Sequence, residues 1–197
     1  MRHAAVSRIA PPVSVGASSA VARASLQSGP LGILVITEQP AGGFLLVTMD
    51  PLGTRGGRTP AASLVRDRLA LGRWPLYECT KNRSAVVAGS RVALYVGGGG
   101  PDAGRIVAVA RVARKLHSST PIDPPRYLTE RPAYCLVLEQ VTYLTPKIDF
   151  RERLPLLSFS PKNQQKWGIV LMGGCRALSE ADWNLLINAP VDTPGPA

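Results

Sequence analysis

Two stretches of the chain place aromatic rings among positive charges, a pattern that suits a flat, anionic ligand. The first stretch covers residues 73–83 and contains Trp74 and Tyr77. The second covers residues 160–167 and ends in Trp167, after lysines and amides. Aromatic faces stack on bases and cations attract phosphates, so a nucleobase with its phosphate is the commonest such ligand. The alternative interpretation is that Trp74 and Tyr77 are ordinary core aromatics beside a solvated basic rim.

The candidate binding residues fall into two groups by side-chain chemistry. The base-binding group offers rings for stacking and polar atoms for the base edge: Trp74, Tyr77, Asn82, Tyr95, Ser158, Phe159 and Trp167. The phosphate-binding group offers cations that hold the backbone without reading sequence: Arg73, Lys81, Arg83, Arg91, Lys162 and Lys166. Taking a base out of a duplex costs a few kcal/mol, and one aromatic face returns about 1 to 3 kcal/mol. We therefore expect two rings to sandwich the base.

The positive charge of the chain is concentrated near the first aromatic stretch. The net charge is +10, and residues 55–91 hold eight lysines or arginines against two acids. Such a surplus favours nucleic acid or an anionic membrane face, with binding that weakens as salt rises. The alternative is a protein that its charge merely keeps soluble. No apolar run reaches the length of about 18 residues that a membrane span needs, so we expect no membrane partner.

Cysteine and histidine usage limits the chemistry that the chain can perform. The three cysteines show no CxxC spacing, and the only histidines are His3 and His117. We therefore predict no disulfide scaffold, no metal centre, no cofactor and a reducing compartment, the cytoplasm. Glu78 is the one carboxylate in the first aromatic stretch, and we expect it to contact the base or pair with Arg73. The sequence thus predicts a binding module without catalytic residues.

Hydrophobic runs and turn signals predict an α+β fold. Apolar runs of strand length cover residues 44–49, 92–96, 105–112, 133–144 and 168–172. Helical spacing from Ala61 reaches Gly72, and a second helix covers residues 180–187 behind a Ser179–Asp182 capping box. Residues 73–83 are expected to be a loop, 97–104 a hairpin tip, and Pro146 the end of the fourth strand. Five or six short strands with few helices favour a small curved sheet or β-barrel flanked by short helices.

The composition also divides the chain into a central domain and two ends. Residues 1–42 are rich in small residues and proline, which predicts a disordered or loosely packed extension. An arginine-rich targeting peptide and upstream sequence without function are two further interpretations of this segment. The domain itself is expected to span residues 43–189, followed by a disordered tail at 190–197.

Four blocks of the sequence, residues 69–78, 89–95, 157–163 and 166–169, together resemble the EVE domain family. This family belongs to the PUA-like group of small β-barrels, with the YTH, ASCH and SRA readers. The similarity spans residues 44–187. It implies a pocket that receives a modified base, such as a methylated or hydroxymethylated cytosine or adenine, swung out of its helix.

The resemblance also bears on partners. Members of the family occur alone or beside nuclease domains in modification-dependent defence. In this chain Pro101 and Asp102 are not followed by an acid with a lysine two residues on, so no nuclease pattern is complete. We therefore expect recognition of nucleic acid, with DNA favoured over RNA, and cleavage only through a separate nuclease or modification enzyme. An RNA-binding module that recognises a modified ribonucleotide is the alternative function.

Overall fold

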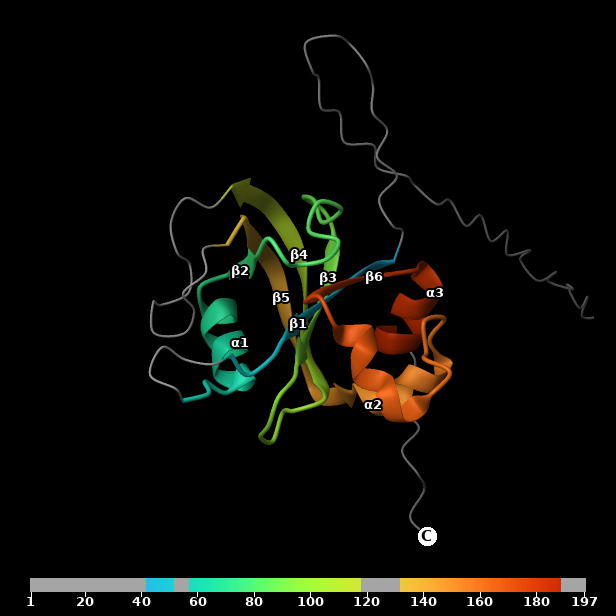
Figure 1. Cartoon of the computed structure of the whole chain (residues 1–197). Coiled ribbons are helices and arrows are strands. Elements are labelled where there is room, and N and C mark those ends of the chain that lie inside the picture. Colours follow the sequence, from blue (N-terminus) through green and yellow to red (C-terminus); the bar gives the residue numbers. More distant parts are fainter. Residues whose placement is uncertain (1–41, 52–56, 118–131, 189–197) are drawn as a thin grey trace, which may run out of the picture. The chain divides into compact units, whose positions relative to one another are not determined.

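Six strands form one curled, mixed sheet (Figure 1). The computed structural model of the protein describes residues 42–51, 57–117 and 132–188. The strands are β1 (Gly43–Thr48), β2 (Arg73–Leu76), β3 (Arg91–Val96), β4 (Arg105–His117), β5 (Tyr134–Asp149) and β6 (Cys175–Leu178). They lie in the order β2-β5-β4-β3-β1-β6; β1 and β3 are parallel and every other neighbouring pair is antiparallel. The predicted α+β fold with a small PUA-like curved sheet is confirmed.

Short helices cover both faces of this sheet. The α-helices are α1 (Ala61–Ala70), α2 (Phe150–Arg153) and α3 (Glu180–Trp183); η1 (Leu154–Leu156) and η2 (Gln164–Leu171) are 3-10 turns, and η3 (Asn184–Asn188) is a π turn. Figure 1 shows α1 on one face and α2 and α3 on the other. Within the described ranges, no helix has the length and apolarity to cross a bilayer.

The alternation of side chains along the strands divides the interior into two cores. In β3, Val92, Leu94 and Val96 belong to the first core, which α1 covers. The intervening Ala93 and Tyr95 belong to the second core, which lies under α2, η2 and α3. Successive residues of a strand point to opposite faces, so one uninterrupted apolar run serves both cores.

Most predicted elements are present where the sequence places them. Strands occupy residues 43–48, 91–96, 105–117 and 134–149, and a helix follows Pro60. The helix at 180–187 is also confirmed, as α3 continued by the π turn. Its predicted cap is present, because Ser179 Oγ accepts a hydrogen bond from Asp182 N at 3.0 Å. The predictions for residues 1–41 and 190–197 lie outside the described residues.

Three predictions about elements are wrong. Residues 73–76 are not loop but β2, which pairs with the first residues of β5. Pro146 does not end β5, because β2 pairs only with Tyr134–Val137 and leaves the later part of β5 as a sheet edge, where proline is tolerated. Residues 168–172 form no strand; they belong largely to η2, with Ile169 59% exposed. The closing strand is β6 instead.

Candidate ligand-binding cavity

Trp74 lies in the first core and does not fit its predicted base-binding role. Its side chain is 2% exposed because β2 pairs it with Leu136, inside the sheet. The guanidinium of Arg68 lies 5.1 Å from the ring centroid. Arg68 also donates a hydrogen bond to Thr48 Oγ1 at 2.9 Å, which fixes this cation over the ring. With its ring enclosed, Trp74 offers no face to a base.

The loop after β2 contains four other predicted residues, and the side chains of Asn82 and Arg83 make contacts within the protein. Asn82, which has a positive φ of 55°, donates from Nδ2 to the carbonyl oxygen of Cys175 at 3.1 Å. Arg83 pairs with Glu78 at 2.7 Å, so the expected partner of Glu78, Arg73, is wrong. Lys81 and Tyr77 lie in the same loop. None of the four lines either cavity described below.

Ser158 and Phe159 are also engaged inside the protein. Ser158 donates from its backbone N and from Oγ to the carboxylate of Asp182, both at 2.7 Å. The guanidinium of Arg176 lies 3.9 Å from the ring centroid of Phe159. Burial acts to raise the pKa of Asp182, but the hydrogen bonds from Ser179 and Ser158 outweigh it and hold that pKa below its ordinary value. This cluster therefore positions the segment that leads into η2.

Tyr95 and Trp167 both line one cavity of about 540 Å³. We call it the Tyr95–Trp167 cavity. Its walls come from the end of β1, the β3–β4 hairpin, the end of β5 and η2: Met49, Tyr95, Gly98, Ala103, Gly104, Asp149, Arg151, Trp167, Gly168, Leu171 and Met172. The volume falls in the range typical of small-molecule sites. Of the seven predicted base-binding residues, the structure brings these two together.

A chain of aromatic rings forms one side of the cavity. Phe150 lies behind it, 5.4 Å from Tyr95 in an edge-to-face contact and 6.5 Å from Trp167 in a tilted one. Arg151 lies 4.9 Å from the ring centroid of Trp167. Tyr95 and Trp167 form no stacked pair, so the arrangement differs from the predicted two-ring sandwich. A flat ligand here would meet one indole, with apolar walls completing the enclosure.

Two polar groups face the same space. Asp149 Oδ1 accepts the backbone N–H of Arg151 at 2.8 Å, which caps α2, and Oδ2 accepts no hydrogen bond from the described residues. Burial, followed by the nearby Asp149 carboxylate, raises the pKa of Tyr95 to about 12. The phenol therefore stays protonated at neutral pH and can donate a hydrogen bond. The cavity thus offers one carboxylate acceptor and one hydroxyl donor.

The glycine-rich hairpin tip forms a wall that Asp50 fixes in place. Asp50 accepts the N–H of Gly99 at 2.9 Å with one oxygen and that of Ala61, at the start of α1, at 2.7 Å with the other. Gly98 has a φ of +70°, and a Cβ there would lie 2.1 Å from the carboxyl carbon of Asp50. Asp50, just after β1, therefore links the hairpin tip to the start of α1 through hydrogen bonds.

A second, more open hollow of about 650 Å³ adjoins the first and shares Arg151 and Trp167 with it. Glu152, Leu154 and Gln165 complete its lining. The predicted phosphate-binding residues Lys162 and Lys166 are exposed near η2 but line neither space. Arg73 and Arg91 lie on β2 and β3. Within the described ranges, no three histidine, cysteine or acidic side chains converge as metal ligands.

Comparison with known proteins gives a plain result. No family model and no curated protein matches the chain. Its resemblance to the EVE family therefore stays a prediction, and its function has to be argued from the cavity. The other nine lining residues were not predicted from the sequence, among them Met49, Asp149, Arg151 and Met172. The one available signal was Asp149 two residues before Arg151, and this pattern also describes a simple helix cap.

Proposed function

We propose that this protein is a nucleic-acid reader that holds one modified nucleobase in the Tyr95–Trp167 cavity. The observation that carries the proposal is the combination, in one cavity, of the Trp167 indole, the Arg151 cation 4.9 Å from its ring centroid, and a carboxylate oxygen of Asp149 that has no partner among the described residues. Aromatic faces bind any base by stacking, whereas a fixed carboxylate distinguishes bases by their hydrogen-bond donors.

The carboxylate favours bases that carry an exocyclic amino group. Aspartate accepts a hydrogen bond from the N4 amino group of cytosine, and the N6 group of adenine is a similar donor. A methyl or hydroxymethyl group on the base would then lie among the flexible side chains of Met49 and Met172, which are 56% and 65% exposed. Methionine adapts to irregular apolar shapes and makes favourable contacts with aromatic rings. The class of ligand is therefore a methylated or hydroxymethylated cytosine or adenine.

The free energies of stacking and of base extrusion favour a base that is already unpaired. One indole face returns about 1 to 3 kcal/mol, and taking a base out of a duplex costs a similar amount. A buried methyl group adds about 0.8 kcal/mol, or roughly fourfold in affinity. A hydroxymethyl group that bonds to the Tyr95 hydroxyl would be read more sharply, because a missing partner leaves a buried polar group unsatisfied.

The rest of the proposal follows the expectations from the sequence. The curled sheet with short helices is consistent with a PUA-like reader. We propose a binding module rather than an enzyme, with DNA as the first partner, RNA as the alternative, and any cleavage left to a separate nuclease. The free thiols Cys79, Cys135 and Cys175 fit a reducing compartment such as the cytoplasm.

Fluorescence titration with short oligonucleotides tests the proposal. DNA and RNA strands carrying cytosine, methylcytosine, hydroxymethylcytosine or methyladenine at one position are compared. The wild-type protein should prefer the modified strands, and Trp167→Ala should lose about 5- to 150-fold in affinity, which corresponds to 1 to 3 kcal/mol. Tyr143→Ala is the matched control, because Tyr143 is 61% exposed and does not line the cavity.

Two outcomes would count against a base reader. In one, the wild-type protein binds all strands alike. In the other, Trp167→Ala, with an unchanged circular dichroism spectrum, binds as well as Tyr143→Ala does. Asp149→Asn adds a second check, because its oxygen can still cap Arg151 N while the negative charge that favours an amino group is gone.

A further inference from the structure

Four arginines lie together on one face of the sheet, and we call them the arginine face: Arg73, Arg91, Arg111 and Arg114. The strand registers establish this grouping. Arg111 pairs with Arg91 on one side and with Glu139 on the other. Val137 pairs with both Arg73 and Arg114. Directly paired residues point to the same side of a sheet, and Val137 and Glu139 are two residues apart on one strand, so both rows share a face.

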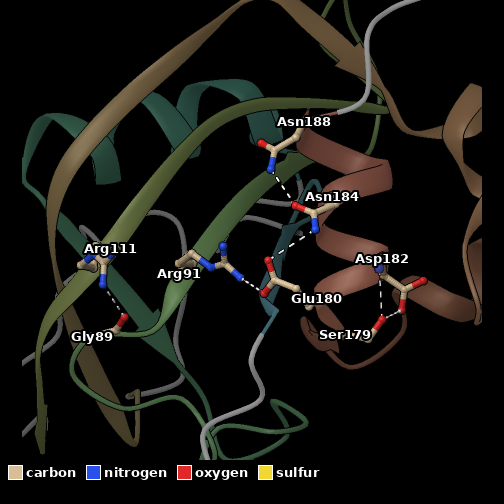
Figure 2. Close-up of polar contacts among 8 residues, drawn as sticks. All are labelled: Gly89, Arg91, Arg111, Ser179, Glu180, Asp182, Asn184 and Asn188. Carbon is tan, nitrogen blue, oxygen red and sulfur yellow. Dashed lines mark hydrogen bonds and ion pairs between the residues drawn. The ribbon is translucent and has the colours of Figure 1, made fainter. Parts of the chain in front are cut away.

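This face is the one that α3 partly covers. The guanidinium of Arg91 lies 4.8 Å from the ring centroid of Trp183, a member of the second core. Figure 2 shows Arg91 directed toward Glu180 at the start of α3, with Arg111 beside it on the neighbouring strand. The arginines therefore lie on the same face of the sheet as the second core, beyond the start of α3. Val137 between them is half-buried and Arg114 is exposed.

The charges on this face are incompletely balanced. Arg91 pairs with Glu180 and Glu139 lies opposite Arg111 in the register, but no ion pair joins Arg73, Arg111 or Arg114 to a carboxylate of the described residues. Arg111 donates instead to the carbonyl oxygen of Gly89 at 3.3 Å. Like charges directly opposite each other on paired strands are destabilising, so the Arg91–Arg111 pair costs stability. A bound anion between these side chains would offset that repulsion.

We propose that the arginine face binds the phosphodiester backbone of a nucleic-acid strand. Guanidinium groups bind phosphates through two parallel hydrogen bonds, and four of them supply a track rather than a single anion site. The Tyr95–Trp167 cavity lies on the same side of the sheet, because Arg91, Ala93 and Tyr95 alternate along β3; the buried Ala93 and the second core lie between the arginines and the cavity. Arg91 and Tyr95 are four residues apart, which is about 13 Å along a strand.

The identity of the strand rests on the proposed function, whereas the attraction to phosphate does not. Under that proposal, one nucleic-acid strand would place a base in the cavity and phosphates on the arginines. Arg73 and Arg91 were already candidates for phosphate binding. The structure adds Arg111 and Arg114 of β4, for which the sequence predicted no binding role.

Affinity measured against salt tests this inference. A fluorescein-labelled single-stranded oligonucleotide is titrated by anisotropy at several salt concentrations with the wild-type protein and the double variant Arg111→Gln, Arg114→Gln. Each phosphate contact on a single strand contributes about 0.7 to the slope of log K against log salt, so the slope should fall by about 1.4. At 0.1 M salt this corresponds to a loss of about 25-fold in affinity.

The matched control is the double variant Arg58→Gln, Arg66→Gln, which removes the same charge from exposed side chains, one of them on α1 across the sheet. Its slope should stay within about 0.3 of the wild-type slope. Equal losses in both double variants, or no loss in either, would overturn the inference. So would binding to phosphatidylserine vesicles, in place of the oligonucleotide, that depends on Arg111 and Arg114.

The same variants separate this inference from the proposed function. The double variant Arg111→Gln, Arg114→Gln should bind modified and unmodified strands more weakly by the same factor. Trp167→Ala should instead lose the preference for modified bases and keep the wild-type salt slope. A protein that shows the predicted loss of slope without any base preference would retain the arginine face and lose the base reader.

Discussion

Replacing Asp182 by asparagine tests how the cavity wall is held. The Asp182 side chain is 3% exposed, and its carboxylate accepts three hydrogen bonds of 2.7 Å, from Ser158 N, Ser158 Oγ and Ser179 Oγ. These bonds join α3 to the segment that continues into η2 and Trp167. Asparagine has one acceptor oxygen and one NH2 group. In Asp182→Asn, the NH2 group must therefore face at least one of the serine groups that now donate to the carboxylate. We expect a loss of about 2 to 4 kcal/mol in unfolding free energy, since each hydrogen bond to a charged group contributes about 1.5 to 3 kcal/mol.

The same substitution should change how stability depends on pH. The pKa of Asp182 in the folded protein lies below its ordinary value of 3.8, because the hydrogen bonds to the carboxylate outweigh burial. The unfolded chain then binds a proton more readily in acid, so this stabilisation is complete above the unfolded pKa and is lost as pH falls through the folded one. The stability gap between the wild-type protein and Asp182→Asn should therefore narrow below about pH 4.

Urea unfolding at neutral and acid pH provides the measurement. Asp102→Asn is the matched control, because Asp102 pairs with Lys147 at the surface, where an ion pair contributes about 0 to 1 kcal/mol. A loss at Asp182 no larger than the loss at Asp102 would contradict the reasoning. A gap that stays constant from pH 7 to about pH 3 would contradict the assignment of the stabilisation to the carboxylate.

Two further predictions concern the cavity itself. Gly98→Ala should destabilise the protein by about 1 to 3 kcal/mol and weaken ligand binding, because the backbone has a positive φ and the new Cβ would meet the hydrogen-bonded Asp50 carboxylate; thermal unfolding and titration measure both effects. Absorbance titration of the five tyrosines should show one that ionises only near pH 12, since burial raises the pKa of Tyr95 to about 12. Tyr95→Phe should remove that step, and a late step that survives this substitution would show that another tyrosine causes it.

Much of the fold could be predicted from local sequence patterns, and the errors in that prediction have physical causes. Residues 44–49 form an uninterrupted apolar run that indicates a strand buried on both faces, and β1 is such a strand. Residues 73–76 are only four residues long, and their pairing with β5 is a tertiary contact that no local pattern records. Residues 168–172 are apolar but short, and periodicity cannot separate strand from helix over five residues.

The site was harder to predict because residue type does not determine burial. Trp74 and Trp167 both stand among cations in the sequence, yet β2 carries Trp74 into the first core while η2 leaves Trp167 half-buried beside a cavity. Asp149 and Arg151 line the cavity because the end of β5 lies beside the β3–β4 hairpin, which is a tertiary contact that the sequence does not record. The arginine face was missed for the same reason, since it combines residues from β2, β3 and β4 that only the register aligns.

The two proposed sites together remove the need for a second stacking ring. At 0.1 M salt, a phosphate contact contributes about fivefold in affinity, so Arg73, Arg111 and Arg114, which form no ion pair with a described carboxylate, would supply roughly 3 kcal/mol. That is comparable to the few kcal/mol needed to bring a base out of a duplex. The arginine face would then provide binding free energy that is the same for every sequence. The cavity needs to supply only the smaller difference between a modified and an unmodified base, and one indole, one carboxylate and two methionines are enough for that.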